Sequence, residues 1–383
     1  MCSCNSMTAV FGLVCLTSTA VSSANVNILL LSAVGISAVY TAVISIMVSL
    51  TTDKNQRSHV LVPVLLSACV IPLSMVFWVI NVSQYDDFLF YINLVISPWR
   101  WLAVVVFPIF MAFWGLRRKS VDISGAILGL FMGFVLTLTN FSHVACLFAF
   151  LVSSTKATKF GAKEKKKFES DFKEGGQRNW IQVLCNGGMA TQLGLLYLLD
   201  VGSAEHPIDF DKYYRSSWLS VGILGAFACC NGDTWASEIG TVMGTKDPFL
   251  ITTLKRVPRG TNGGISWVGL LVSILGGITV GLSYYLTVLI TVDTVILQLA
   301  APQWPIIIIG GIGGLFGSVI DSFLGAMLQY SGINENGKVV ERPGKRVKHI
   351  CGRQILDNHS VNLLSSVITA LILPEIAKLI LSI

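Results

Sequence analysis

Apolar residues in this chain are gathered into long blocks, and this pattern limits its fold more than any other feature. Several blocks are about 20 residues long, the length of helix that spans a hydrocarbon core of roughly 30 Å. Only 13% of the residues are charged, whereas a soluble domain normally carries about 25%. The sequence therefore predicts an all-α fold, a polytopic integral membrane helical bundle of about ten transmembrane segments, some of them broken or short. The expected segments are about 28–50, 60–80, 98–116, 121–139, 141–155, 181–199, 217–235, 265–290, 304–329 and 360–382.

The positions of lysine and arginine predict the orientation of these segments, because basic loops stay on the cytoplasmic side. With loop 156–180 placed in the cytoplasm, alternate threading puts five loops there, and they hold 23 of the 27 Lys and Arg residues. Both chain termini then face the lumen or the exterior. We expect an endomembrane such as the endoplasmic reticulum. The five cytoplasmic loops are 51–59, 117–120, 156–180, 236–264 and 330–359.

Several common types of site are excluded by spacing. The nine cysteines lie mostly inside apolar blocks and the five histidines form no cluster, so neither a disulfide framework nor a zinc site is predicted. The chain has no GxxxxGK[ST] loop, which excludes a P-loop NTPase. No Ser-His-Asp or Cys-His arrangement is supported by the spacing of these residues.

Five polar patches interrupt the apolar pattern, and all of them fall near the predicted cytoplasmic ends of segments. They are Glu174–Asn179, which leads into a segment interrupted at Asn186–Gly188, Asn231–Gly240, Pro258–Gly264, Asp321 within its segment, and Leu356–Asn362. Glycine and asparagine pairs of this kind are also ordinary in loops and helix caps. Asp321 is different, because burying an acid several residues inside an apolar span costs a few kcal/mol. It needs a partner, a metal ion or a water-filled cavity.

Together the patches favour a phosphate site. Gly260–Gly264 is predicted to open a helix, where exposed backbone N–H groups bind anions, and Arg259 comes directly before it. Asp233, Glu238, Asp321 and Asp357 supply hard oxygen ligands suited to Mg²⁺. Asp233 and Glu238 are five residues apart, about 140° around an α-helix. Either the helix breaks near Gly232, or one of the two acids has another role.

Six motifs in the chain support a family resemblance. They are Ser97-Pro-Trp-Arg-Trp101, Lys173-Glu-Gly-Gly-Gln-Arg-Asn-Trp180, Gly232-Asp-Thr-Trp-Ala-Ser-Glu238, Gly260-Thr-Asn-Gly-Gly264, Ala301-Pro-Gln-Trp-Pro305 and Leu356-Asp-Asn358. In them the chain resembles the transmembrane protein 19 family, part of the wider domain-of-unknown-function 92 group. We expect residues 58–383 to form the family membrane domain, and residues 1–57 to be an N-terminal extension with one transmembrane helix.

The resemblance implies an activity. Members of the group in plants and cyanobacteria are similar to phytyl-phosphate kinases, which pass a phosphoryl group onto an isoprenyl monophosphate. The motifs at 232–240 and 260–264 are also similar to those of CTP-dependent polyprenol kinases and phosphatidate cytidylyltransferases. The expected protein is an integral membrane phosphotransferase that takes a phosphoryl group from CTP or ATP, depends on Mg²⁺, and acts on an isoprenyl phosphate or a similar lipid. No nucleic acid partner is expected.

The predicted site combines the patches with this resemblance. Its catalytic residues are Asp233, Glu238 and Asp321, and its metal ligands are Asp233, Asp321 and Asp357. The predicted nucleotide- and phosphate-binding residues are Arg178, Asn179, Arg259, Gly260, Thr261, Asn262, Gly263, Gly264 and Asn358.

Two other classes of function fit parts of the pattern. A transporter would use broken helices at Asn186–Gly188 and around Asp321 to bind its substrate, although transporter sites usually lie near the bilayer midplane and come with internal repeats. A non-enzymatic structural or assembly role is the other alternative. An oligomer is possible, because small-residue runs such as Gly310–Gly314 allow close packing of helices within one bundle or between two chains.

Overall fold

A computed structural model describes residues 98–160, 177–244, 247–344 and 346–381, most of them in long helices. Eight of the predicted apolar segments coincide with helices in this part of the chain to within a few residues. These helices are α4 (Pro98–Arg117), α5 (Ile123–Thr139), α6 (Phe141–Lys159), α8 (Trp180–Asp200), α9 (Tyr214–Trp235), α11 (Trp267–Thr291), α13 (Pro305–Leu328) and α14 (Asn358–Leu381). The two remaining predicted segments and the extension at 1–57 lie outside the described residues.

Three of these helices, α11, α13 and α14, are each long and apolar enough to cross a membrane. Shorter apolar helical stretches occur at Leu102–Arg117 in α4 and at Ile123–Thr139. The structure thus confirms a mostly helical protein with candidate membrane spans.

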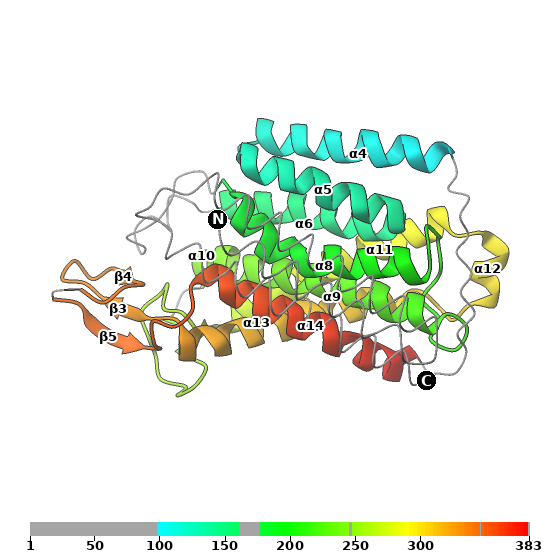
Figure 1. Cartoon of the computed structure of the whole chain (residues 1–383). Coiled ribbons are helices and arrows are strands. Elements are labelled where there is room, and N and C mark those ends of the chain that lie inside the picture. The colour runs from blue at the N-terminus through cyan, green and yellow to red at the C-terminus, as the bar shows by residue number, and fades with distance from the viewer. Residues whose placement is uncertain (1–97, 161–176, 245–246, 345, 382–383) are drawn as a thin grey trace, which may run out of the picture.

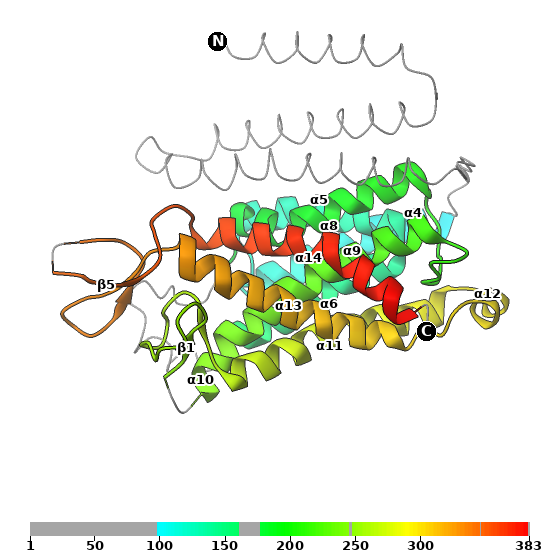
Figure 2. The same cartoon turned by 90° about the horizontal axis from the view of Figure 1, so that it is seen from below.

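Helix α9 occupies the centre of the bundle. It packs against α6, α8, α11, α13 and α14, and every residue from Ser216 to Gly232 is buried. Helix α4 lies at one edge, where it packs against α5 (Figure 1, Figure 2). Residues at the end of α9 are therefore placed where several helices converge.

Glycines bring α9, α11 and α13 into backbone contact. A Cβ atom added at Gly277 of α11 would lie 2.1 Å from the carbonyl oxygen of Gly310, and one added at Gly232 would lie 2.6 Å from that of Gly314. No side chain fits in these gaps. The sequence left open whether the small-residue run packs within one bundle or between two chains. In the structure Gly310 and Gly314 pack within one bundle.

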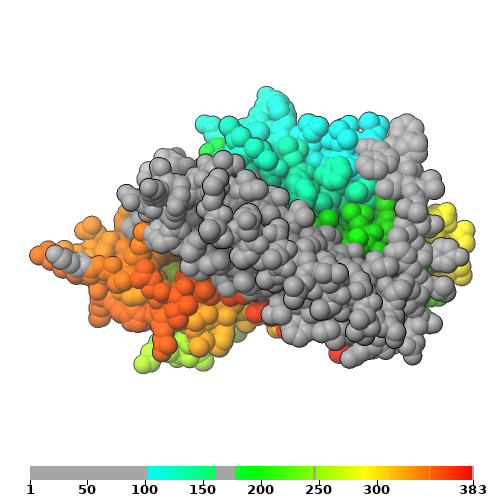
Figure 3. Space-filling model, in the orientation of Figure 1, coloured from blue at the N-terminus to red at the C-terminus, as the bar shows by residue number. Residues whose placement is uncertain are grey.

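Short strands correct the all-α prediction. Strands β1 (Phe249–Leu250) and β2 (Gly264–Ile265) pair antiparallel, and β3 (Ser331–Ile333) lies between β4 (Val339–Val340) and β5 (Lys348–Cys351). Strands of two to four residues are too short to produce a readable alternation of apolar and polar residues. All five lie at one end of the bundle, here called the sheet end, and β3–β5 project from it (Figure 3).

The opposite end carries a short helix, α12 (Thr294–Leu299), and is here called the α12 end. The predicted break at Asn186–Gly188 is wrong, because α8 runs without interruption from Trp180 to Asp200. Helix α13 likewise passes through Asp321 unbroken. The small residues at these positions pack against neighbouring helices: a Cβ atom at Gly187 would lie 2.7 Å from the sulfur of Met132.

Candidate functional site at the sheet end

Asp321 of α13 is buried, with 9% of its surface exposed. The Ser365 hydroxyl of α14 donates a hydrogen bond to its Oδ2 atom at 3.1 Å. The Asn362 amide, with its nitrogen turned toward the acid, donates to the same oxygen at 3.2 Å and to the Asn358 carbonyl at 2.9 Å. In the opposite orientation the Asn362 nitrogen instead faces the side-chain oxygen of Asn186 in α8, at 3.3 Å. Neutral groups of α14 thus stabilise the carboxylate.

Asp233, at the end of α9, is an acid whose charge acts on Asp321. The two acids also act on the Cys230 thiol. Two like charges close together in a buried place repel each other strongly. A site of this kind favours a bound cation or a shared proton, as the sequence predicted for these two residues.

A π-helical turn follows α9 and carries Glu238. The turn spans Ala236–Gly240, and α9 continues through Gly232 without a break. A π-turn closes over five residues where an α-turn closes over four. Asp233 lies before this turn and Glu238 within it, so the turn does not span the two acids. Since α9 does not break near Gly232, the structure favours the other alternative raised by the sequence, in which the two acids have different partners.

Glu238 acts on a different partner, the guanidinium of Arg178. Burial lowers the pKa of Arg178, and the charge of Glu238 opposes this effect. The backbone of Arg178 bonds to Ser120 and Asp122 in the turn between α4 and α5, and its side chain donates to the Ser120 hydroxyl at 3.2 Å. Arg178 is therefore held rigidly beside α5 and faces the acidic end of α9.

Three of the predicted phosphate or metal residues have clear structural roles. The Asn179 side chain caps α8 and forms a capping box with Gln182. Asp357 caps α14 by accepting the Ser360 backbone N–H at 3.0 Å, and the Thr261 hydroxyl donates to the Pro258 carbonyl at 2.6 Å within its own turn. Their predicted roles in binding phosphate or metal stay predictions.

The predicted glycine loop does not open a helix. Gly264 belongs to β2, and α11 begins only at Trp267, with the Ser266 side chain as its cap. The reason is local: Gly260 and Gly263 adopt φ values of +85° and +78°, which turn the chain into a strand pair.

The loop instead packs against α13, one turn beyond Asp321. A Cβ atom at Gly263 would lie 2.6 Å from the Ser322 carbonyl oxygen and 2.4 Å from the Cβ atom of Ala326. The Asn262 backbone N–H donates to the Ser331 hydroxyl at 3.1 Å, and the Nε atom of Arg259 lies 4.0 Å from Asp247. The loop is thus placed near the acids, although by sheet and helix contacts and not by a helix N-terminus.

No three His, Cys, Asp or Glu side chains among the described residues lie close enough to hold a metal ion together. The Asp357 carboxylate caps α14, and its predicted role as a metal ligand stays a prediction. Mg²⁺ usually binds through one or two protein carboxylates plus substrate phosphates. The Asp321 carboxylate is a hard oxygen ligand that fits this ion, although the Cys229 thiol also acts on it.

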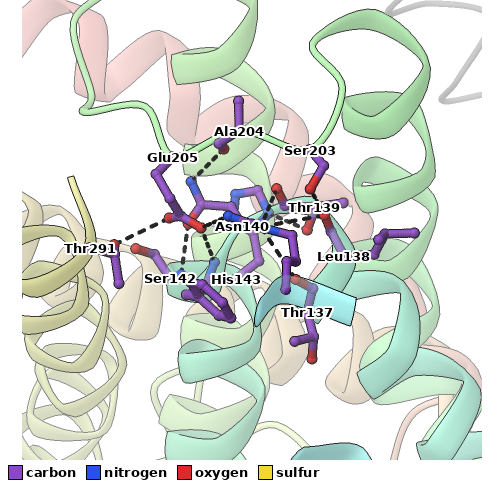
Figure 4. Close-up of polar contacts among 12 residues, drawn as sticks. Thr137, Leu138, Thr139, Asn140, Ser142, His143, Ser203, Ala204, Glu205 and Thr291 are labelled. Atoms are coloured by element: carbon purple, nitrogen blue, oxygen red, sulfur yellow. Dashed lines mark hydrogen bonds and ion pairs between the residues drawn. The ribbon is translucent and has the colours of Figure 1, made fainter. Parts of the chain in front are cut away.

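The α12 end holds a buried ion pair that sequence reasoning missed (Figure 4). Arg100 of α4 bonds to Glu205 at 2.5 Å and to the Thr139 carbonyl at 3.1 Å, and Glu205 also accepts the Phe141 backbone N–H at 2.9 Å. The pair closes the turn between α5 and α6. One signal was present in the sequence: Arg100 is among four basic residues outside the predicted cytoplasmic loops.

The Ala301–Pro305 motif also has a structural role at the α12 end. The Gln303 side chain accepts the Ile208 backbone N–H at 2.8 Å and donates to the Ile208 carbonyl at 2.9 Å. These two bonds fasten the loop between α8 and α9 to the start of α13. Two of the six family motifs therefore stabilise this end, while the other four meet at the sheet end.

Comparisons with known proteins match a large part of the chain. The family model described as "Integral membrane protein DUF92" matches residues 106–370. Protein PGR of Arabidopsis thaliana is 41% identical over 276 residues, which cover 72% of this chain and 95% of that protein. An uncharacterized membrane protein of Methanocaldococcus jannaschii is 26% identical over 224 residues, covering 58% of this chain and 81% of that protein.

A shorter match is found to Protein VTE6, chloroplastic, of Arabidopsis thaliana, which is 32% identical over 127 residues, 33% of this chain and 35% of that protein. No solved structure matches the chain. The family model covers well over half of the residues, and the first relative matches along nearly its whole length. The chain therefore belongs to the DUF92 family of integral membrane proteins.

Proposed function

We propose that this protein is a membrane phosphotransferase that passes a phosphoryl group from CTP or ATP to an isoprenyl phosphate or a similar lipid phosphate. The observation that carries the proposal is that Asp233 ends the central helix α9 where its charge acts on Asp321 of α13, and that the 260–264 loop packs against α13 beside Asp321. Acids and a glycine turn in one place suit a reaction that depends on positioning and charge neutralisation.

The residues have distinct proposed roles. Asp233 and Asp321 hold a Mg²⁺ ion, which when bound neutralises charge on the phosphates. Arg178 binds the accepting phosphate through its planar N–H fork, and Glu238 orients Arg178. Backbone N–H groups of Gly260 and Gly263 and the Asn358 side chain contact the nucleotide, whereas the N–H groups of Thr261, Asn262 and Gly264 bond within the chain.

The orientation of the protein fits this proposal. The described loops 117–120, 247–264 and 330–344 carry basic residues at the sheet end, so we place this end in the cytoplasm, where nucleotide is available, and the α12 end in the lumen of an endomembrane such as the endoplasmic reticulum. The transporter alternative has lost its main support, because α8 and α13 are continuous helices.

The test is phosphate transfer by the purified full-length protein in detergent. Radiolabelled CTP or ATP, Mg²⁺ and a panel of isoprenyl alcohols and monophosphates are supplied to wild type, Asp233→Asn and Asp211→Asn. Asp211 is an exposed acid at the α12 end and provides a matched control. We expect label in lipid from wild type and Asp211→Asn, and a loss on the order of 10³-fold in Asp233→Asn.

Two results would contradict the proposal. Folded wild type that transfers no label to any lipid in the panel would remove the kinase activity. Normal transfer by Asp233→Asn would remove this acid from the site.

A further inference from the structure

An apolar pocket lies between α4, α5, α6 and α8, on the side of the bundle next to Arg178. Its described lining is formed by Met111, Ala112, Val121, Gly125, Ala126, Gly129, Met132, Leu147, Phe150, Leu151, Arg178, Val183, Asn186 and Gly187. Twelve of these fourteen residues are apolar or glycine, and the two exceptions are Arg178 and Asn186. The pocket thus combines a long apolar wall with one cation and one amide.

The pocket is kept open by the absence of a side chain at Gly129. A Cβ atom added there would meet nothing within 4 Å. At Gly125, by contrast, a Cβ atom would lie 2.6 Å from the Arg178 carbonyl oxygen, so that glycine is needed for helix packing. Met111 and Met132 form part of the wall, and methionine side chains adapt easily to the shape of a bound apolar group.

The two polar residues connect the pocket to the acids at the sheet end. The side-chain oxygen of Asn186 lies 3.3 Å from the Asn362 amide, which contacts Asp321. The guanidinium of Arg178 lies over the Phe150 ring, 5.8 Å from its centroid, and feels the charge of Glu238. A molecule in the pocket would therefore have its polar end beside the carboxylates and its apolar part between the helices.

We propose that this pocket binds the single apolar chain of a lipid phosphate, with the phosphate held by Arg178 and Asn186. The inference deepens the proposed function, because it places the accepting lipid of that reaction. Arginine matches phosphate oxygens with two parallel hydrogen bonds, and the apolar lining supplies binding energy in proportion to the length of chain that it covers. The single apolar wall and single cation of this pocket match a lipid with one chain and one phosphate, so a two-chain lipid is expected to bind weakly.

The test measures binding directly, without nucleotide. Full-length protein in nanodiscs is titrated with a fluorescent geranylgeranyl monophosphate, and competitors are the isoprenyl alcohol, a five-carbon isoprenyl monophosphate, inorganic phosphate and a two-chain phosphatidic acid. The variants are Gly129→Ala, Gly129→Leu, Arg178→Gln, Arg178→Lys and, as a control, Ile127→Phe. Ile127 lies on the same helix, is 55% exposed and does not line the pocket.

We expect Gly129→Leu to weaken binding of the long chain by at least about tenfold while the five-carbon phosphate competes as before, since only the longer chain reaches the filled space. Gly129→Ala should give a smaller loss in the same direction, and Ile127→Phe no loss. Arg178→Gln should abolish the preference for the phosphate over the alcohol, and Arg178→Lys should restore part of it.

Three results would overturn the inference. These are unchanged long-chain binding in folded Gly129→Leu and Gly129→Ala, equal competition by the two-chain lipid, or an unchanged phosphate preference in Arg178→Gln. Comparing binding with transfer separates this inference from the proposed function. If wild type binds the lipid phosphate but transfers no label, the kinase proposal is contradicted and the pocket stands. If the Gly129 variants transfer label and bind the long chain as wild type does, the pocket alone is contradicted.

Discussion

The two ends of the bundle differ in which groups contact their buried charged side chains. At the α12 end, acids and bases are matched: Arg100 pairs with Glu205 at 2.5 Å and Arg215 with Asp200 at 2.9 Å. At the sheet end, the buried Asp321 accepts hydrogen bonds from neutral groups and lies under the influence of a second acid. Ion pairs thus hold elements together at the α12 end, whereas at the sheet end hydrogen bonds from Ser365 and Asn362 stabilise the buried acid.

The matched end also explains the basic residues that fall outside the predicted cytoplasmic loops. Arg100 and Arg215 form the ion pairs, Lys212 donates to the Leu299 carbonyl, and the Lys378 ammonium lies 5.2 Å from the centre of the Tyr214 ring. Each has a local partner in the structure. Their positions therefore do not argue against the orientation that the other 23 basic residues predict.

The largest expected effect is a loss of stability without a loss of activity. Glu205→Gln removes the charge opposite a buried guanidinium, which we expect to lower the free energy of unfolding by about 3 kcal/mol. Thermal unfolding in detergent measures this change, and a double-mutant cycle with Arg100→Gln measures the coupling of the pair. Transfer activity per folded molecule should stay at the wild-type level. A drop of tenfold or more in that activity, with stability unchanged, would reverse the roles of the two ends.

A smaller effect is expected from the loop at the sheet end. Gly263→Ala forces a side chain into a position with φ near +78° and against α13, so we expect a cost of about 1–3 kcal/mol and a loss of transfer activity. Gly337→Ala is the matched control, because Gly337 has φ near +74° with nothing within 4 Å of an added Cβ atom. It should carry only the backbone cost and keep full activity. Equal effects of the two variants would show that the contact with α13 is unimportant.

The smallest effect concerns pH at the α12 end. Burial lowers the pKa of His206, in the loop between α8 and α9, below its usual value of about 6.5. The unfolded chain then binds more protons than the folded chain as the pH falls below 6.5, so stability declines with acidity in that range. Unfolding temperatures at pH 7 and pH 5 should differ less in His206→Gln than in wild type. An equal or larger difference in the variant would exclude this histidine as a source of the pH dependence.

The helices could be predicted from sequence because each contains a long stretch rich in apolar residues, and three of them have the length and hydropathy of a membrane span. Asp321 was identifiable for the same reason, since one acid in an apolar run has a clear energetic cost. The ion pair of Arg100 and Glu205 was not predicted, because its members are 105 residues apart and meet only when α4 docks on the bundle. The π-turn and the strand pair at Gly264 depend on backbone hydrogen bonds that residue types do not encode.

The glycine contacts among α9, α11 and α13 have a mechanical consequence. Where backbones touch, as at Gly277 and Gly310, no side chain can change rotamer to let one helix slide past another. These three helices therefore behave as a stiff frame that carries Asp233 and Asp321 at a fixed spacing. Among the described elements, α4 packs mainly against α5 rather than against this frame. A change in the position of α4 would therefore leave the spacing of the two acids unchanged.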